Sequence, residues 1–241
     1  MKKIMSLFSS CVFLVSCCAG PLNDVSSVKP QSAVTLEKEK KSYKVVGSIK
    51  KIKYLTVKLN GLELQNFGTL CSAVWIKQGI LLTANHCVKE SILFSYSTLD
   101  DTDDVYRLAA PFARDEKNDL AILYVDPVTE PPHDIAVLSD IDIESGESVD
   151  IVGHTVGLEW TYSKGYVAAI RTNMLGPGQT DAEKVIQISS PAWMGNSGGG
   201  AFDDGGSLIG LCSWISTSGP FLTFFIHRDT IKKFLKREHV I

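Results

Sequence analysis

The sequence predicts an all-β protein, because short apolar runs recur along the chain and turn residues separate them. Two pairs of runs flank glycine-containing turns, and helical spacing is clear only in the last dozen residues. The 241 residues, 44% of them hydrophobic, suffice for one large β domain or for two small ones that share a core. Many short strands with regularly spaced turns are typical of a sandwich or a barrel.

The expected strands begin at residue 52. The run Ile52–Leu59 ends at Asn60-Gly61, which is a strong hairpin signal. The runs Cys71–Ile76 and Ile80–Thr83 flank Gln78-Gly79, which indicates a second hairpin. The remaining expected strands are Leu120–Val125, Ser148–Val152, Gly165–Ile170, Val185–Ser189 and Leu208–Trp214.

The chain ends in a predicted helix. Ile231, Phe234 and Leu235 recur at helical spacing and would form one apolar face. Asp229 or Thr230 can serve as the N-cap, because a short oxygen-bearing side chain accepts from the free amides of a first turn. We therefore expect a short C-terminal helix that packs on the β structure.

The N-terminus has the features of an export signal. Lys2 and Lys3 give it a positive start, and Ile4–Val15 is a short, mostly apolar run. The residues Leu14-Val15-Ser16-Cys17 resemble the lipobox of bacterial lipoproteins, which implies a signal over residues 1–17 and a lipid on Cys17. Cleavage just after Ala19, with release as a free secreted protein, is the alternative.

Residues 18–42 are polar and without periodicity, which indicates a flexible tether before a domain over residues 43–241. The expected location is a membrane-anchored lipoprotein that faces the periplasm or the cell exterior, or alternatively a secreted protein. A formal net charge of −3 argues against a nucleic-acid surface. No apolar stretch approaches the roughly 18 residues that a membrane-spanning helix needs.

Three separate segments carry residue types that suit nucleophilic catalysis. A serine hydroxyl is a weak nucleophile that needs a base, and histidine suits this task because its pKa lies near neutrality. A carboxylate behind the ring fixes its tautomer and stabilises the imidazolium that forms. The segments are Leu82-Thr83-Ala84-Asn85-His86-Cys87, Asn118-Asp119-Leu120-Ala121-Ile122-Leu123 and Gly195-Asn196-Ser197-Gly198-Gly199-Gly200.

These residues receive distinct expected roles. Ser197 is the predicted nucleophile, His86 its base and Asp119 the residue that orients the base. The glycines around Ser197 let the backbone turn sharply and expose its amides. We expect the N–H groups of Gly195 and Ser197 to form an oxyanion hole.

The segments resemble the three catalytic motifs of trypsin-like peptidases, in that family's order of His, Asp and Ser. Lys164-Gly165-Tyr166-Val167 is similar to a strand of the second barrel, and Phe225-Ile226 to the last strand of glutamyl endopeptidases and high-temperature-requirement peptidases. The resemblance covers residues from about 45 to 241. It implies a chymotrypsin-like fold of two antiparallel six-stranded β-barrels, with their boundary near residues 126–147 and the catalytic cleft between them. It implies no metal and no organic cofactor.

The six cysteines sort by position. Cys11, Cys17 and Cys18 belong to the signal region, Cys71 and Cys87 remain as a potential pair, and Cys212 is left over. In the trypsin-like family a disulfide joins the cysteine after the catalytic histidine to one on the preceding strand. The resemblance therefore implies a Cys71–Cys87 disulfide, which would need an oxidising compartment. Cys212, on an apolar strand, is expected to be a buried free thiol.

The resemblance also implies a substrate pocket built from Pro191, Ser213, Trp214, Ile215 and Thr223. No carboxylate stands at these positions, and Ile215 replaces the glycine of members with an open pocket. Glutamyl endopeptidases carry a histidine where this chain has a cysteine, at position 212. We expect small or medium apolar residues before the scissile bond, and an extended substrate that pairs with the strand at Ser213–Ile215.

One residue departs from the pattern of the digestive members of the family. Asn196 stands where those enzymes carry an aspartate that pairs with a new N-terminus after zymogen cleavage. An amide can be satisfied by ordinary hydrogen bonds. We therefore predict activity without N-terminal processing beyond removal of the signal.

The predicted function is that of an exported serine endopeptidase that hydrolyses protein or peptide substrates through an acyl-enzyme. Two other classes are compatible with the same residues. One is a catalytically inactive binding protein on the same fold, and the other is an esterase-type serine hydrolase, because a Ser-His-Asp triad also attacks esters. The sequence predicts no oligomeric state.

Overall fold

The structure is a computed structural model that describes most of the chain from residue 49 onwards. The described ranges are 49–61, 70–89, 91–101, 107–126, 133–172, 174, 176, 184–216 and 222–241. The predicted signal, the predicted lipid site at Cys17 and the predicted tether lie outside these residues. Within them, no helix is both long and apolar enough to cross a lipid bilayer.

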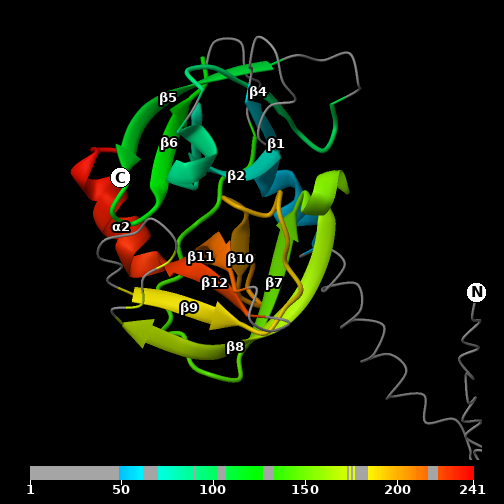
Figure 1. Cartoon of the computed structure of the whole chain (residues 1–241), viewed down its shortest axis with the longest axis vertical. Helices are drawn as coiled ribbons and strands as arrows, with labels where there is room; N and C mark the ends of the chain where they lie inside the picture. The colour runs from blue at the N-terminus through cyan, green and yellow to red at the C-terminus, as the bar shows by residue number, and fades with distance from the viewer. Residues whose placement is uncertain are drawn as a thin grey trace, which may run out of the picture. The chain divides into compact units, whose positions relative to one another are not determined.

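Two closed antiparallel barrels make up the described structure (Figure 1). The first barrel has the strand order β1-β2-β3-β6-β5-β4 and closes by pairing of β1 with β4. Closure leaves no free sheet edge. Its strands are β1 (Thr56–Gly61), β2 (Leu70–Lys77), β3 (Ile80–Thr83), β4 (Phe94–Ser97), β5 (Arg107–Asp115) and β6 (Leu120–Tyr124).

The second barrel has the order β10-β11-β12-β9-β8-β7 and closes by pairing of β7 with β10. Its strands are β7 (Ser148–Gly153), β8 (Thr161–Thr172), β9 (Lys184–Ile188), β10 (Gly200–Phe202), β11 (Leu208–Ile215) and β12 (Thr223–His227). The predicted fold class, two six-stranded antiparallel barrels with a short C-terminal helix, is confirmed.

The sequence of strand β2 is mostly apolar and does not alternate with polar residues. Its side chains point to opposite sides in turn. Ala73 and Trp75 point into the first barrel, whereas Val74 and Ile76 join a second cluster that also contains Phe202 and other residues of the second barrel. Both faces of the strand are therefore buried, and the seam between the barrels forms one continuous core.

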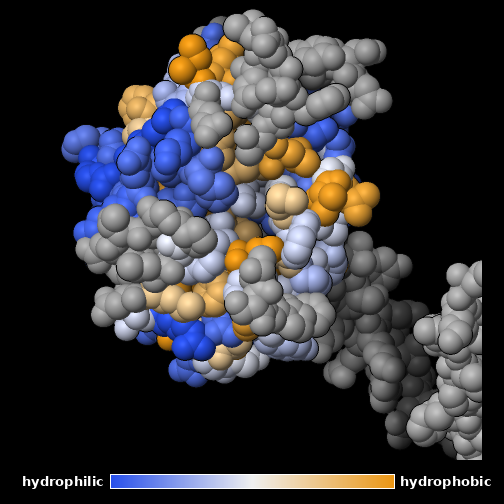
Figure 2. All heavy atoms as spheres, in the orientation of Figure 1, coloured by the Kyte–Doolittle hydropathy of each residue, from blue (hydrophilic) through white to orange (hydrophobic). Residues whose placement is uncertain are grey.

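The C-terminal helix α2 (Arg228–Arg237) covers part of this seam. Ile231, Phe234 and Leu235 are buried in the cluster shared by the two barrels. The opposite face of the helix is charged, and Figure 2 shows hydrophilic side chains gathered over it. The predicted apolar face is thus confirmed, but the predicted N-cap is wrong. His227 takes that position, and its ring Nδ1 accepts from the N–H of Asp229.

The prediction for the first strand is partly wrong. Residues 49–55 are helical, and only the second half of Ile52–Leu59 lies in β1. The predicted turn at Asn60-Gly61 is also wrong, because the strand continues through both residues and pairs with β2 and β4. Ile52 and Leu55 are fully buried in the shared core, so apolar residues that suggested a strand belong to a helix.

The apolar pattern missed several strands. In β5 the apolar residues 108–113 include Pro111, which argues against a strand, and only Ala109 and Asp115 are buried. β4 has four residues and β10 has three, which is too short for a periodic signal. The strand expected at Gly165–Ile170 is longer than predicted, because β8 begins at Thr161. The hairpin across Gln78-Gly79 is confirmed, with β2 and β3 paired on either side.

Candidate active site

Two neighbouring strands bring His86 and Asp119 together. Thr83, the last residue of β3, pairs with Ala121 near the start of β6. The pairing continues past the strands, where the Asn85 N–H donates to the Asp119 carbonyl at 3.1 Å. The chain leaves β3 into a single 3-10 turn, η1 (Asn85–Val88), which presents His86. Asp119 directly precedes β6 and has a φ of +55°. This left-handed conformation is tolerated best by asparagine and aspartate among side-chain-bearing residues.

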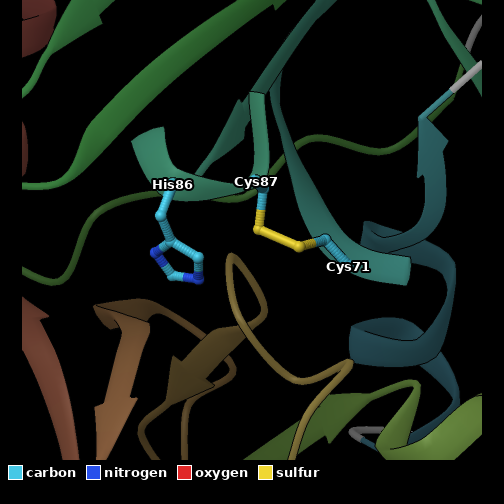
Figure 3. A group of neighbouring side chains, drawn as sticks. All are labelled: Cys71, His86 and Cys87. Carbon is cyan, nitrogen blue, oxygen red and sulfur yellow. A yellow bond between two sulfur atoms is a disulfide. The ribbon is translucent and has the colours of Figure 1, made fainter. Parts of the chain in front are cut away.

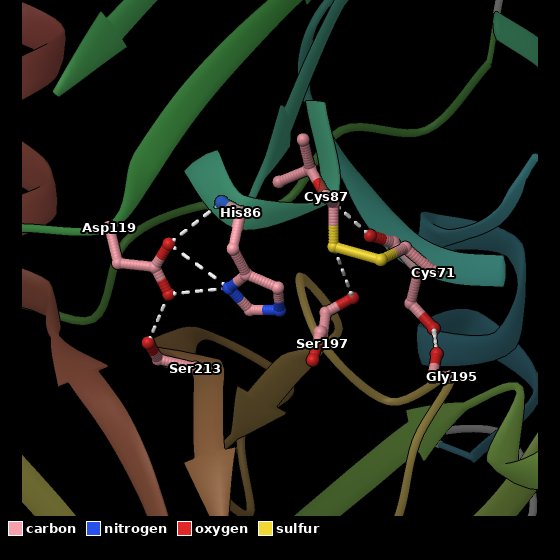
Figure 4. Close-up of a disulfide and its surroundings, with 9 residues drawn as sticks. Cys71, His86, Cys87, Asp119, Gly195, Ser197 and Ser213 are labelled. Atoms are coloured by element: carbon pink, nitrogen blue, oxygen red, sulfur yellow. Dashed lines mark hydrogen bonds and ion pairs between the residues drawn. A yellow bond between two sulfur atoms is a disulfide. The ribbon is translucent and has the colours of Figure 1, made fainter. Parts of the chain in front are cut away.

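The carboxylate of Asp119 holds the His86 ring and backbone at the same time. The ring Nδ1 lies 2.9 Å from Oδ2 and 3.1 Å from Oδ1, and the His86 N–H donates to Oδ1 at 2.9 Å (Figure 4). Because an ionised carboxylate can only accept, the ring hydrogen sits on Nδ1 and Nε2 is left as an acceptor. The carboxylate is buried, whereas the His86 side chain is 45% exposed.

Ser213 completes the surroundings of this carboxylate. Its hydroxyl, on β11 of the second barrel, donates to Oδ2 of Asp119. The carboxylate therefore accepts from a side chain of each barrel as well as from the His86 backbone.

The backbone before Ser197 forms a tight turn. The Asn196 N–H donates to the Trp193 carbonyl at 3.1 Å, and Gly195, the third residue of the turn, has a φ of +99°. This is the pattern of a type II turn, which requires glycine at that position. The Met194 carbonyl accepts from the Val156 N–H at 2.8 Å. In a trans peptide the N–H points away from the carbonyl, so the Gly195 N–H faces the opposite side.

Ser197 itself is fixed through its backbone to the first barrel. Its carbonyl accepts from the Ser72 N–H at 2.8 Å, and the Ser72 hydroxyl donates to the Gly195 carbonyl at 2.7 Å. In the described part of the chain, the N–H groups of Gly195 and Ser197 make no hydrogen bond. These are the two N–H groups that the sequence predicts as oxyanion donors.

The structure brings the three predicted catalytic residues together. The hydrogen bond between His86 and Asp119 is formed, whereas one between Ser197 and His86 is not. Figure 4 shows Ser197 on the side of the His86 ring that faces away from Asp119. Among the described residues the Ser197 hydroxyl makes no hydrogen bond, so its contact with the His86 Nε2 is not formed. Such bonds are often long in the absence of substrate.

A disulfide joins Cys71 of β2 to Cys87 of η1, with a Cα–Cα distance of 6.2 Å. It lies beside the His86 ring (Figure 3). The potential ligand atoms of Cys71, His86 and Cys87 lie within 4.8 Å of one another, and no other such group occurs in the described ranges. Since the two sulfurs are bonded to each other, neither is available as a thiolate ligand, and this group is not a metal site.

The sequence matches the model of one protein family over more than half of its length. The model of the trypsin-like peptidase domain matches residues 71–211, which include both cysteines of the disulfide, all three predicted catalytic residues and the turn at Gly195. The chain belongs to the trypsin-like peptidase family. The predicted resemblance is confirmed.

Relatives of known name are proteases. Over 161 residues the chain is 30% identical to the magnetosome formation protease MamE of Paramagnetospirillum magneticum, covering 66% of this chain and 21% of that protein. It is 32% identical over 160 residues to a probable periplasmic serine endoprotease, DegP-like, of Brucella suis, covering 65% and 30%. The chain thus spans less than a third of these relatives.

A solved structure shows the same fold. The serine endoprotease from Yersinia pestis superposes with a TM-score of 0.67 at 20% identity, over 80% of this chain and 65% of that one. The family and the relatives together support the predicted class of enzyme, a serine endopeptidase.

Four of the five residues predicted to form the substrate pocket lie on the paired strands β11 and β12, and Pro191 lies between β9 and β10. Ile215, the last residue of β11, pairs directly with Thr223, the first residue of β12. Thr223 is buried, and its hydroxyl donates to the Ser190 carbonyl at 2.9 Å. Trp214 stacks on Phe224 with ring centroids 5.0 Å apart. Of the other predicted residues, Ser213 is buried against Asp119 and Pro191 is exposed. None of the five carries a charge.

Several residues that contact the candidate site could not be predicted from the sequence. Ser72, Thr155 and Val156 contact the turn before Ser197, but a single serine, threonine or valine carries no recognisable signal. The second role of Ser213, its bond to Asp119, was missed for the same reason. Cys212 is buried in the core of the second barrel, as expected, and burial raises its pKa to about 12.

Proposed function

We propose that the protein is a serine endopeptidase in which Ser197 is the nucleophile, His86 the general base and Asp119 the residue that orients it. The convergence of these three residues at the seam between the barrels carries the proposal. His86 and Asp119 come from one barrel, and Ser197 lies on the turn that precedes β10 of the other.

The proposed reaction proceeds through an acyl-enzyme. The Ser197 Oγ attacks the substrate carbonyl carbon while its proton passes to the His86 Nε2. The carbonyl oxygen becomes an oxyanion that accepts from the N–H groups of Gly195 and Ser197, an interaction worth roughly 3–4 kcal/mol per donor. The imidazolium then gives its proton to the leaving amine as the peptide bond breaks. A water molecule, deprotonated by His86, hydrolyses the ester, and the proton returns to Ser197.

We further propose that small or medium apolar residues precede the scissile bond. The pocket residues carry no charge that could pair with Lys, Arg or Glu. Ile215 lies directly opposite Thr223 on the paired strands, where its side chain would narrow the proposed pocket. The substrate backbone would pair in extended form with Ser213–Ile215 of β11.

Export and tethering complete the proposal. The names of the relatives include a periplasmic endoprotease, and the Cys71–Cys87 disulfide persists only in an oxidising compartment. The lipobox-like residues before Cys17 support a lipid anchor. Metabolic labelling with palmitate tests this part: incorporation that survives in Cys17→Ser would contradict the anchor, and the peptidase proposal would stand unaffected.

The test of the catalytic proposal combines labelling and proteolysis. A serine-reactive fluorophosphonate should label the wild-type protein, and Ser197→Ala should abolish both labelling and casein cleavage. A folded protein that labels no better than Ser197→Ala would instead be a binding protein. Hydrolysis of simple esters without casein cleavage would identify an esterase-type hydrolase. Ser148→Ala is a suitable control, because this serine bonds the exposed Asp204 and lies outside the site.

A further inference from the structure

The turn at Gly195 has two possible states, and only one of them leaves an oxyanion hole. In the type II turn seen here the Gly195 N–H faces the substrate side. In a type I turn the central peptide is rotated, and the Met194 carbonyl would take the place of the N–H. A carbonyl oxygen there would repel an oxyanion. Something must therefore hold the Met194–Gly195 peptide in the observed orientation.

Residues 154–157, which we call the bracing segment, make the contacts that do this. The Val156 N–H donates to the Met194 carbonyl at 2.8 Å, which fixes the carbonyl away from the substrate side. The Thr155 hydroxyl donates to the Asn196 Oδ1 at 2.8 Å, which fixes the residue between the turn and the nucleophile. Asn196 is 2% exposed, so this amide oxygen has little access to water as an alternative partner.

The segment and the turn also fit closely in shape. A Cβ atom on Gly195 would lie 2.2 Å from the His154 carbonyl oxygen, and a Cβ on Gly153 would lie 2.3 Å from the Asn196 Oδ1. Val156 has a φ of +51°, a conformation that β-branched residues rarely adopt. The surrounding contacts must hold it there, which indicates a rigid support.

The bracing segment is itself anchored in the interior. His154 is fully buried, and its Nδ1 accepts from the Trp160 N–H at 3.2 Å. The Trp160 indole donates to the Thr56 carbonyl of β1 at 3.2 Å and meets the His154 ring edge-on. The chain of contacts thus runs from the first barrel through Trp160 and His154 to the turn at Gly195.

We propose that the bracing segment holds the oxyanion hole open and that Thr155 is a positioning residue, acting on the Gly195 turn through Asn196. The inference rests on the proposed peptidase function. The hydrogen-bond partner of the Asn196 side chain is then Thr155, which lies between β7 and β8 of the same barrel. Thr155 acts through the oxyanion hole, which stabilises charge that develops only in the transition state. Its loss should therefore lower kcat more than it raises KM.

The test compares Thr155→Val, which keeps the shape and removes the donor, with Thr155→Ser, which keeps the donor. We expect Thr155→Val to lower kcat about tenfold with little change in KM, and to slow fluorophosphonate labelling in parallel. Thr155→Ser should restore most of the activity. Thr172→Val, an exposed threonine at the end of β8, is the matched control and should behave as wild type. Equal kcat in Thr155→Val and wild type would overturn the inference.

A double-variant cycle separates positioning from general destabilisation. If Thr155 acts through Asn196, Thr155→Val combined with Asn196→Ala should lose no more activity than the worse single variant. Multiplying losses would overturn the inference, even if Thr155→Val also lowers the melting temperature. A wild-type protein that neither labels nor cleaves casein would instead refute the peptidase proposal, so the two failures are distinguishable.

Discussion

Ser213 of the second barrel donates a hydrogen bond to the carboxylate of Asp119 in the first barrel. The same Oδ2 atom lies 2.9 Å from the His86 Nδ1. The orientation of the predicted base therefore depends on how the two barrels dock, and a side chain of one barrel helps to hold the catalytic pair of the other.

Removing this hydroxyl should weaken catalysis without preventing binding. Hydrogen bonds to charged groups contribute about 1.5–3 kcal/mol, so Ser213→Ala should lower kcat by roughly tenfold or more. The alanine keeps the β11 backbone that is proposed to pair with substrate, and KM should change little. Steady-state kinetics on one peptide substrate check this. A purely raised KM would show that Ser213 acts in binding and not through Asp119.

The pocket should widen when Ile215 is replaced. Ile215→Gly removes the side chain that faces Thr223 across the strand pair. For each enzyme, kcat/KM for substrates with Phe or Tyr before the scissile bond can be divided by kcat/KM for substrates with Ala there. We expect this ratio to be at least tenfold higher in Ile215→Gly than in the wild type. One buried methylene is worth about 0.8 kcal/mol, so about two of them account for the roughly 1.4 kcal/mol of a tenfold change. Cleavage of a peptide library measures the specificity profiles of the wild type and of Ile215→Gly. A wild-type profile dominated by Arg, Lys or Glu would contradict the assignment of the pocket.

The disulfide should stabilise the first barrel. The two cysteines are 16 residues apart, and closing a loop of this size contributes roughly 3 kcal/mol in the chain-entropy model. Cys71→Ala combined with Cys87→Ala should lower the free energy of unfolding by about this amount in urea denaturation. Reductant should lower the stability of the wild type similarly and leave the double variant unchanged. Wild-type stability that is indifferent to reductant would mean that the bond is not formed.

Two buried histidines should make the fold sensitive to acid. Burial lowers the pKa of His154 and of His227 to about 4, and the neighbouring Lys184 adds to the effect at His227. In the unfolded chain each ring titrates near 6.5, so between pH 6.5 and 4 the unfolded state binds more protons. The free energy of unfolding should therefore fall as the pH falls through this window, by about 3 kcal/mol per histidine.

Urea denaturation at pH 7.5, 5.5 and 4.5 measures this dependence. His227→Asn is the informative variant, because an asparagine oxygen can replace the ring nitrogen that accepts from the Asp229 N–H. It should keep the helix cap at pH 7.5 and lose about half of the acid sensitivity. An unchanged pH dependence would show that His227 does not titrate in this range.

The family could be predicted from the sequence because the residues that indicate it belong to local motifs. His86, Asp119 and Ser197 each lie in a short segment with its own pattern, and their order along the chain identifies the family without knowledge of distances. Predictions that depended on local apolar pattern alone were less successful. Ile52 and Leu55 look like strand residues, yet they lie in a helix, because the shared core accepts apolar side chains from either element.

The sequence by itself determined the residue types of the candidate site, the turn glycine at position 195 and the absence of charge among the residues predicted to form the pocket. The tertiary structure decided how those residues are held. Thr155, Ser72 and Ser213 carry no local signal, because a hydroxyl gains its meaning only from the partner that folding places within about 3 Å. The partners are up to 123 residues away in the chain, as for Ser72 and Gly195. The docking of the two barrels brings Ser72 and Ser213 to their partners, whereas the fold of the second barrel brings Thr155 to Asn196.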